Sequence, residues 1–130
     1  MKKIGVIVNT KRPRAEGILS EFRRLAESHG FVLFAESKTM ADTLDAEYLP
    51  IKEFANEVDV VVAMGGDGTM LYAARALEGS GIPIMGINLG SLGFLTGVSD
   101  QEISAALDAL KTGEFQVSER EMATCRVIKD

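Results

Sequence analysis

An almost unbroken apolar run that stops at a glycine-rich loop constrains the fold of this chain more than any other feature. Residues 58–64 read Val-Asp-Val-Val-Val-Ala-Met, and Gly-Gly-Asp-Gly-Thr follows directly at residues 65–69. A short run of this kind indicates a strand buried on both faces, which is typical of parallel sheets. Because glycine has no Cβ, the loop can adopt positive φ angles and can bring backbone N–H groups close to a ligand. A helix beginning near Thr69 would direct its partial positive charge to the same place, so the loop is predicted to bind phosphate.

The loop differs from the two best-known phosphate-binding motifs. The chain has no G-x-x-x-x-G-K-[ST] motif, because no lysine follows Gly68. It also lacks the G-x-G-x-x-G of dinucleotide-binding folds, because Leu71 stands where the third glycine would be. A carboxylate at Asp67 is unusual in a phosphate loop, since it would repel the ligand. Asp67 is therefore a candidate for chemistry, and the alternative is an ordinary N-cap of the following helix.

The rest of the chain alternates between strand and helix patterns. Apolar runs predict strands at residues 3–8, 31–35, 58–64 and 82–88. Helical spacing predicts helices from Pro13 to Gly30, through residues 51–58, from Met70 to Leu77, and from the capping box of Ser99 and Glu102 to Gly113. The third of these helices is predicted to pack through Met70, Leu71, Ala74 and Leu77. Residues 36–49 show neither pattern and are predicted to be irregular.

Strands that alternate with amphipathic helices predict an α/β fold, a Rossmann-like parallel sheet with helices on both faces. Ligands of such sheets bind beyond the carboxyl ends of the strands. The loop at residues 65–69 and a second glycine-rich segment at residues 89–95 leave consecutive strands at that edge, so they are predicted to line one crevice. The basic side chains after the first strand, Lys11, Arg12 and Arg14, either attract phosphates there or form a solvated basic loop.

Composition narrows the classes of function. The formal net charge is −5, whereas proteins that bind nucleic acid normally show a basic face, so no nucleic-acid partner is expected. No apolar run approaches the length of a membrane span, and the first run is too short for a signal peptide, so a cytoplasmic protein is expected.

The single cysteine, Cys125, is expected to be buried, and the single histidine, His29, is expected to hydrogen-bond the last carbonyls of a helix. Catalysis would rest on carboxylates, hydroxyls or lysines, and no protein metal site is predicted.

Two segments together resemble the NAD kinases. The first is Gly-Gly-Asp-Gly-Thr-Met-Leu at residues 65–71, and the second is Gly-Ile-Asn-Leu-Gly-Ser-Leu-Gly-Phe-Leu-Thr at residues 86–96. The first segment is shared with lipid kinases of the diacylglycerol and sphingosine type and, in variant form, with 6-phosphofructokinase. The second is much more specific to NAD kinases. The resemblance implies a fold related to the N-terminal domains of diacylglycerol kinase and 6-phosphofructokinase.

The resemblance also implies a division into domains. Residues 1–118 correspond to the N-terminal α/β nucleotide-binding domain of that family, and residues 119–130 correspond to the start of a C-terminal β-rich domain that is otherwise missing. An extended pattern from residue 116 onward agrees with this expectation. Because the second domain supplies part of the substrate site in the family, the isolated 130-residue chain is expected to be inactive. The complete protein is expected to be a homo-oligomer, either a dimer or a tetramer.

The activity that the resemblance implies is transfer of a phosphoryl group from ATP, or from polyphosphate, to the 2′-hydroxyl of the adenosine ribose of NAD, giving NADP. Mg²⁺ would arrive with ATP and keep mostly phosphate and water ligands. Asp67 would be the catalytic residue, which accepts the proton of the attacking hydroxyl. The positions carried over for NAD are Asp67, Gly68, Leu71, Tyr72 and Phe94. Those carried over for the ATP phosphates are Gly65, Gly66, Gly68 and Thr69.

One position departs from the family pattern, because many members carry a basic residue where this chain has Tyr72. A phosphate contact there is expected to be lost or replaced by stacking.

Two other functions stay open at this point. A lipid kinase would share the aspartate loop but should present an apolar or basic surface to a membrane, and a non-catalytic nucleotide-binding fragment would bind without turnover.

Overall fold

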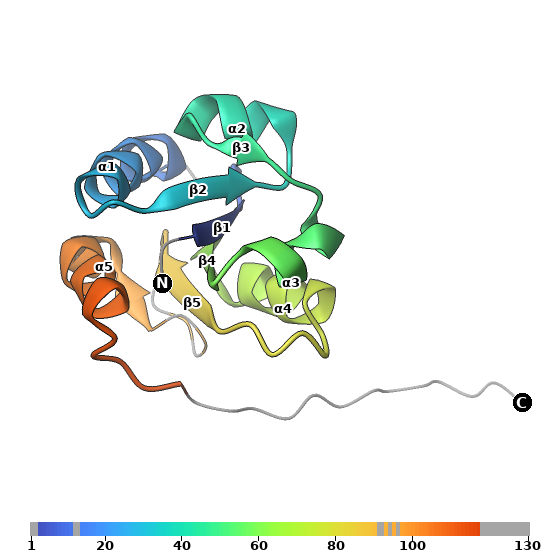
Figure 1. Cartoon of the computed structure of the whole chain (residues 1–130). Helices are drawn as coiled ribbons and strands as arrows, with labels where there is room; N and C mark the ends of the chain where they lie inside the picture. The colour runs from blue at the N-terminus through green and yellow to red at the C-terminus, as the bar shows by residue number, and fades with distance from the viewer. Residues whose placement is uncertain (1–2, 12–13, 91–92, 94, 96, 118–130) are drawn as a thin grey trace, which may run out of the picture.

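The structure, a computed structural model, describes residues 3–11, 14–90, 93, 95 and 97–117 (Figure 1). Its helices and strands follow in the order β1 (Lys3–Val8), α1 (Ala15–Ser28), β2 (Val32–Ala35), α2 (Lys38–Leu44), β3 (Glu47–Tyr48), α3 (Phe54–Glu57), β4 (Val60–Gly65), α4 (Asp67–Ala76), β5 (Ile84–Asn88), β6 (Val98–Ser99) and α5 (Ile103–Thr112). Single 3₁₀ turns, Ile51–Glu53 and Asp100–Glu102, lead into α3 and α5. Helices and strands therefore alternate along most of the chain, as the sequence predicts.

The strands form one parallel sheet in the order β3-β2-β1-β4-β5-β6. At its centre β1 pairs with β4, with Val8 opposite Met64, and β4 pairs with β5, with Gly65 opposite Asn88. The order runs outward from β1 to β3 and then, on the other side, outward from β4 to β6. The reversal between β1 and β4 is the kind of switch point at which open α/β sheets bind ligands. The predicted parallel α/β fold is confirmed.

The central strand β4 supplies two separate cores, one on each face of the sheet. Val60, Val62 and Met64 enter the larger core, beneath α1, α2 and α5. The alternate residues Val61 and Ala63 enter the smaller core, beneath α3 and α4. Figure 1 shows α1 and α5 on one side of the strands and α3 and α4 on the other. Because successive side chains of a strand point to opposite faces, a strand covered on both sides requires an apolar residue at nearly every position.

The predicted start and end of α5 are both confirmed. The Glu102 carboxylate accepts hydrogen bonds from the backbone N–H of Ser99 (3.1 Å) and from its hydroxyl (2.9 Å). These two bonds, the backbone one foremost, lower the pKa of Glu102 below its ordinary value. At the other end Gly113 has a φ of 81°, in the left-handed region that glycine adopts without strain.

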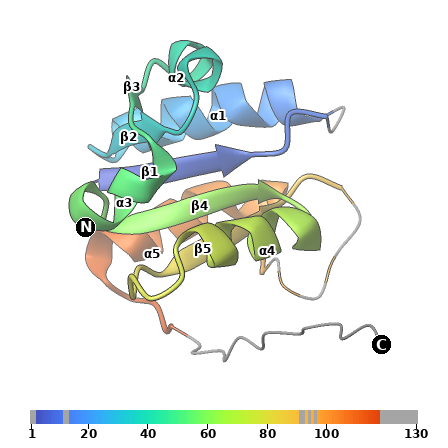
Figure 2. The ribbon, with the colours of Figure 1, turned by 90° about the vertical axis from the view of Figure 1, so that its right-hand side faces the viewer.

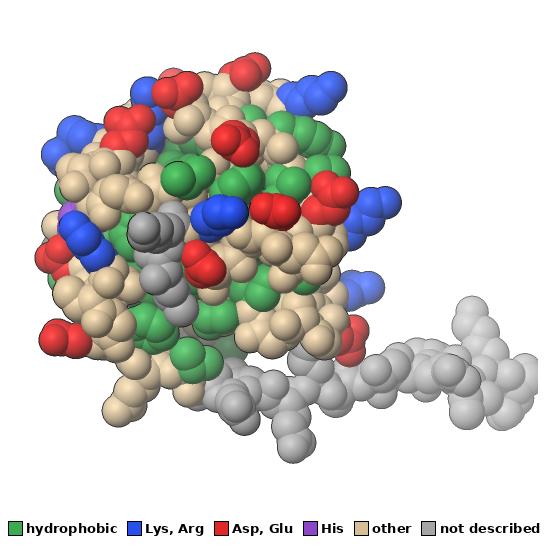
Figure 3. Space-filling model, viewed as in Figure 1, with side chains coloured by type: hydrophobic (Ala, Val, Ile, Leu, Met, Phe, Trp, Pro, Cys, Tyr) green, Lys and Arg blue, Asp and Glu red, His purple; other side chains and the backbone are tan. Residues whose placement is uncertain are grey.

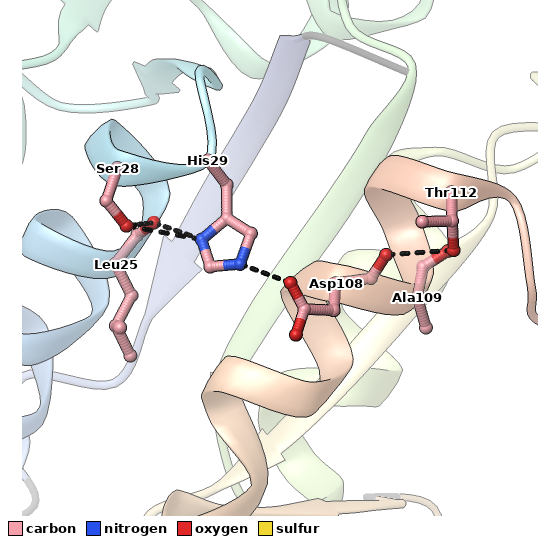
Figure 4. A network of polar contacts seen from close by, with 6 residues as sticks. All are labelled: Leu25, Ser28, His29, Asp108, Ala109 and Thr112. Atoms are coloured by element: carbon pink, nitrogen blue, oxygen red, sulfur yellow. Dashed lines mark hydrogen bonds and ion pairs between the residues drawn. The ribbon is translucent and has the colours of Figure 1, made fainter.

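His29 links the end of α1 to α5 (Figure 4). Its Nδ1 lies 2.7 Å from the carbonyl oxygen of Leu25, which confirms that the histidine serves the last carbonyls of its helix. Since a carbonyl oxygen can only accept, Nδ1 carries the hydrogen in this contact. Its Nε2 lies 2.6 Å from Oδ1 of Asp108 on α5. His29 therefore joins two helices that cover the larger core.

The segment at residues 36–49 was predicted to be irregular, and this prediction is wrong. The segment contains α2, which begins after Ser37, whose hydroxyl accepts a hydrogen bond from the Met40 backbone N–H (3.1 Å). Met40, Ala41 and Leu44 enter the larger core. The segment also contains β3, which is only two residues long, as is β6 near α5. An element of two residues has no visible alternation, and the seven residues of α2 span only about two helical turns.

The packed face of α4 agrees with the prediction in part, because Met70 and Leu77 pack against the smaller core as predicted. Ala73 and Leu77 enter the smaller core, whereas Leu71 is 55% exposed. Helical spacing relative to Leu77 fits both Ala73 and Ala74, so the pattern alone could not select between two neighbouring faces.

Two expectations about the C-terminal part of the chain fall on residues that the structure does not describe. The predicted burial of Cys125 lies there, and so does the predicted start of a second domain at residues 119–130. Both stay predictions.

Candidate functional site

The candidate site lies at the switch point, where the carboxyl ends of the central strands meet. The backbone N–H of Asn9, just after β1, donates to the carbonyl of Met64 (2.9 Å), and that of Leu89, just after β5, donates to the carbonyl of Gly65 (3.0 Å). Figure 2 shows β1 and β4 running side by side toward this edge. A cleft of about 600 Å³ opens here, lined by Ile7, Val8, Asn9, Lys11, Glu36, Gly66, Gly68, Thr69 and Tyr72. The predicted phosphate loop therefore faces a cavity of the size that small-molecule ligands occupy.

Gly65 is required because of crowding. An ideal Cβ at this position would lie 2.9 Å from Cβ of Thr69 and 3.2 Å from Cβ of Asn9, and would overlap the Thr69 hydroxyl. By contrast, a Cβ at Gly68 would meet nothing within 4 Å. None of the glycines at 65, 66 and 68 has a positive φ. The reason predicted from the sequence is therefore wrong in one respect: Gly65 allows side chains and strands to approach closely and does not supply an unusual backbone conformation.

Asp67 joins the two glycine-rich segments. Its Oδ1 accepts a hydrogen bond from the backbone N–H of Leu95 (2.9 Å). Gly93 lies against the same carboxylate, since an ideal Cβ on Gly93 would be 2.8 Å from Cγ of Asp67. The N-cap of α4 is Gly66, and Asp67 is the first residue of the helix, so the alternative assignment of Asp67 as an ordinary N-cap is wrong. This contact brings the two segments together at Asp67, but of their described residues only Gly66, Gly68 and Thr69 line the cleft, so a crevice lined by both segments stays a prediction.

Asn88 orders the start of the second segment. It is only 5% exposed although it is polar, and its Oδ1 accepts a hydrogen bond from the backbone N–H of Gly90 (2.8 Å). Buried polar side chains are normally hydrogen-bonded, because an unpaired one would be costly. The sequence interpretation assigned no role to this residue. The signal in the sequence was an amide that ends an otherwise apolar strand, directly before a glycine-rich turn.

Tyr72 and Glu36 meet across the cleft. The phenol of Tyr72, on α4, donates to Oε2 of Glu36, which directly follows β2 (2.8 Å). The hydrogen bond to Glu36, together with partial burial and the negative charge of that carboxylate, raises the pKa of Tyr72 above its ordinary value. Glu36 was missed at the level of sequence because it lies in a segment that was predicted to be irregular. Its signal was an acid placed immediately after a buried strand.

The basic side chains that follow β1 are placed differently from one another. Lys11 lines the cleft, and its backbone N–H donates to Oδ1 of Asn9 (3.1 Å), which fixes the turn after β1. Arg14 directly precedes α1 and is not among the residues that line the cleft, and Arg12 lies outside the described residues. Of the positions predicted to contact NAD, Gly68 and Tyr72 line the cleft, whereas Asp67 is not among its lining residues. Leu71 is exposed on α4, and Phe94 lies outside the described residues.

The surface and the donor groups limit what the site can bind. Acidic and basic side chains are interspersed on the face shown in Figure 3. Over the described part of the chain, no helix is long and apolar enough to cross a membrane. Within the same residues, no three histidine, cysteine or acidic side chains lie together as a metal ion would require. The groups that face the cleft are instead backbone amides, a lysine, a carboxylate, a hydroxyl and a phenol.

Comparison with known proteins agrees with this geometry. Residues 4–115 match the family described as the ATP-NAD kinase N-terminal domain. The chain is 40% identical over 127 residues to an NAD kinase of Geobacter metallireducens, covering 98% of this chain and 44% of the relative. It is 36% identical over 130 residues to an NAD kinase of Ruminiclostridium cellulolyticum, covering 100% of this chain and 46% of the relative. The chain thus spans somewhat less than half the length of these relatives.

The fold also matches a solved structure, that of yeast NADH kinase complexed with NADH. The TM-score is 0.75 at 17% identity, over 86% of this chain and 38% of the yeast chain. At that identity the likeness concerns the fold alone. The family match, which covers most of the chain, shows that this protein belongs to the NAD kinase family.

Proposed function

We propose that the protein to which this chain belongs transfers the γ-phosphoryl group of ATP to the 2′-hydroxyl of the adenosine ribose of NAD, giving NADP. The observation that supports this most directly is the Asp67 carboxylate, which both glycine-rich segments hold and which stands in the chain between Gly66 and Gly68, two residues that line the cleft. The relatives named NAD kinase, 36% and 40% identical over nearly the whole chain, support the choice of substrate.

Phosphoryl transfer requires little covalent work from a protein. It depends on alignment of donor and acceptor, on neutralisation of charge, and on a group that orients or deprotonates the attacking hydroxyl. Asp67 suits the last role, because a carboxylate accepts the proton as the hydroxyl attacks the γ-phosphorus and the bond to the leaving ADP breaks. Its bond to the Leu95 N–H keeps the side chain in one orientation. The phosphates would face Gly66, Gly68 and Thr69 at the start of α4, whose dipole favours anions there.

Mg²⁺ would reach the site together with ATP. The donor groups that face the cleft fit this arrangement, because they include a single carboxylate, that of Glu36, and Mg²⁺ bound to nucleotides keeps mainly phosphate and water ligands. The metal would neutralise phosphate charge during transfer. The chain's own contribution is then Lys11, the backbone amides and the orientation of Asp67.

The acceptor side of the site is expected to need residues beyond those described. Leu71 and Tyr72, both predicted to contact NAD, are 55% and 48% exposed on α4. A substrate that rests on exposed side chains is poorly aligned, and alignment is the main source of acceleration in this reaction. We therefore expect the 130-residue chain alone to turn over far more slowly than the roughly 1–100 per second of ordinary kinases.

The test uses a polypeptide of full family length, such as this chain fused to the remaining part of the Geobacter metallireducens relative. Asp67→Asn should lower NADP formation by about 10²–10⁴-fold, as expected for the loss of a general base. Asp42→Asn on the exposed side of α2 is the matched control and should leave turnover unchanged. Near-normal turnover of Asp67→Asn would remove the residue from the mechanism. ATP binding without NADP formation in the unmutated fusion would instead indicate a nucleotide-binding module.

A further inference from the structure

The hydrogen bond between Tyr72 and Glu36 crosses the carboxyl end of β1. Glu36 directly follows β2, and Tyr72 lies on α4, which follows β4, while β1 lies between β2 and β4 in the sheet. Both side chains line the cleft, and the phenol donates to Oε2 of the carboxylate (2.8 Å). The bond therefore fixes where this carboxylate stands in the cleft.

Lys11 lines the same cleft, on the turn that follows β1. Its backbone N–H donates to Oδ1 of Asn9, which holds the turn, and the residue is exposed. Among the described residues no ion pair joins Lys11 to Glu36. An ammonium group and a carboxylate on two long side chains of one cleft nevertheless attract each other. The bond from Tyr72 engages the carboxylate without using the lysine.

An anion that enters the cleft competes with Glu36 for Lys11. A lysine that was paired with Glu36 would have to leave that carboxylate before it could bind a phosphate oxygen. Exposed ion pairs of this kind shift an equilibrium by up to about fivefold. Because the Tyr72 hydroxyl is a neutral donor, it satisfies Glu36 and leaves the charge of the lysine to the ligand.

We propose that Tyr72 is a positioning residue of the phosphate site. Its hydroxyl holds the Glu36 carboxylate away from Lys11, so that the ammonium group of Lys11 stays available to a ligand phosphate. Tyr72 acts here through Glu36, whereas the sequence predicted a direct contact with NAD. The inference rests on the proposed function only in that phosphate lies in the cleft.

The test measures the affinity of the 130-residue chain for inorganic pyrophosphate without divalent cations, by NMR titration of the backbone amides of Gly66, Gly68 and Thr69. Tyr72→Phe removes only the hydroxyl and should weaken pyrophosphate binding about threefold to fivefold, because the released carboxylate pairs with Lys11. Glu36→Gln should bind pyrophosphate at least as tightly as the unmutated chain, because a negative charge leaves the cleft. In the Glu36→Gln background Tyr72→Phe should have no further effect, because the competing carboxylate is gone.

Three controls keep the result interpretable. Tyr48→Phe makes the same change at the chain's other tyrosine, which is 44% exposed on β3 and does not line the cleft, and it should leave the affinity unchanged. Lys11→Met should weaken binding and should also remove the effect of Tyr72→Phe. The third control needs no change at Glu36 and decides the matter even if Glu36→Gln does not fold. As the ionic strength rises, the affinities of Tyr72→Phe and the unmutated chain should converge, because salt screens an exposed ion pair.

The inference is overturned if Tyr72→Phe binds pyrophosphate as tightly as the unmutated chain. It is also overturned if Tyr72→Phe causes the same loss with and without Glu36→Gln, because Tyr72 would then contact the ligand itself. Absence of pyrophosphate binding by the unmutated chain would overturn it as well. Since neither ATP nor NAD is present, a full-length fusion that makes NADP would keep the proposed function and lose only this role of Tyr72.

Discussion

The contact between Gly93 and Asp67 permits a quantitative test with Gly93→Ala. An ideal Cβ at this position would lie 2.8 Å from Cγ and 3.1 Å from Oδ2 of Asp67, whereas carbon atoms in contact are separated by about 3.5–4.0 Å. Overpacking of this kind lowers the free energy of unfolding by about 1–3 kcal/mol. Displacement of the Asp67 carboxylate would also weaken the hydrogen bond that it accepts from the Leu95 N–H. A cost of about 2 kcal/mol corresponds to a fall in Tm of about 8 °C in a domain of this size.

Thermal and urea unfolding of the chain would measure this cost, and the same loop offers a matched control. An ideal Cβ at Gly97 meets nothing within 4 Å, so Gly97→Ala should change stability by no more than about 0.5 kcal/mol. The cost of Gly93→Ala should largely disappear in an Asp67→Ala background, because the new methyl group then has room. A coupling free energy of at least about 1 kcal/mol is therefore expected between the two positions. Equal stability of Gly93→Ala and Gly97→Ala, or simple additivity with Asp67→Ala, would refute the argument.

Three further predictions concern the remaining features. Gly65→Ala should destabilise the chain by about 1–3 kcal/mol, because its methyl group overlaps Thr69, whereas Gly68→Ala should stabilise it, since alanine favours a helix by about 1 kcal/mol; equal melting temperatures would contradict this. Glu36→Gln should lower the pKa of Tyr72, as measured by an absorbance titration of the phenolate. Because folding raises this pKa, the hydrogen bond between Tyr72 and Glu36 stabilises the folded chain at neutral pH, and this stabilisation is lost as the pH rises through the raised pKa of Tyr72. Glu102→Gln should make the free energy of unfolding in urea less sensitive to acid. Because folding lowers the pKa of Glu102, its hydrogen bonds stabilise the folded chain above the ordinary carboxyl pKa, and this stabilisation is lost as the pH falls through the lowered pKa. An unchanged pH profile would contradict the capping box.

The central architecture could be predicted because its signals are local and repeated. The strands at residues 3–8 and 58–64 are apolar on both faces, so the parallel sheet and its covering helices followed from the pattern. The placement of both glycine-rich segments at one edge followed from topology alone. The short elements α2, β3 and β6 did not show such a pattern, and tertiary packing against neighbouring strands determines them.

The site was predicted only in part, for a different reason. Gly65 and Asp67 stood out because they belong to a dense local motif. Two contacts in the site join residues far apart in the chain: Gly93 meets Asp67 over 26 positions, and Tyr72 meets Glu36 over 36 positions. No pattern in a single sequence indicates such pairs. The exposed position of Leu71 depended on which of two adjacent alanines faces the sheet. Sequence therefore located the loops, while the structure was needed to identify which side chains meet between them.

The way α4 is anchored has a consequence for motion. Ala73 is the only residue buried within this helix, whereas α1 buries Ala15, Ile18, Leu19, Phe22 and Ala26. Elements with little buried apolar area open at lower free energy, so amide protons of α4 should exchange faster than those of the adjoining strand β4. The same helix carries Gly68, Thr69 and Tyr72 into the cleft. The side of the cleft formed by α4 is thus expected to open more readily than the side formed by the strands. A bound nucleotide should therefore slow amide exchange in α4 more than in any strand of the sheet.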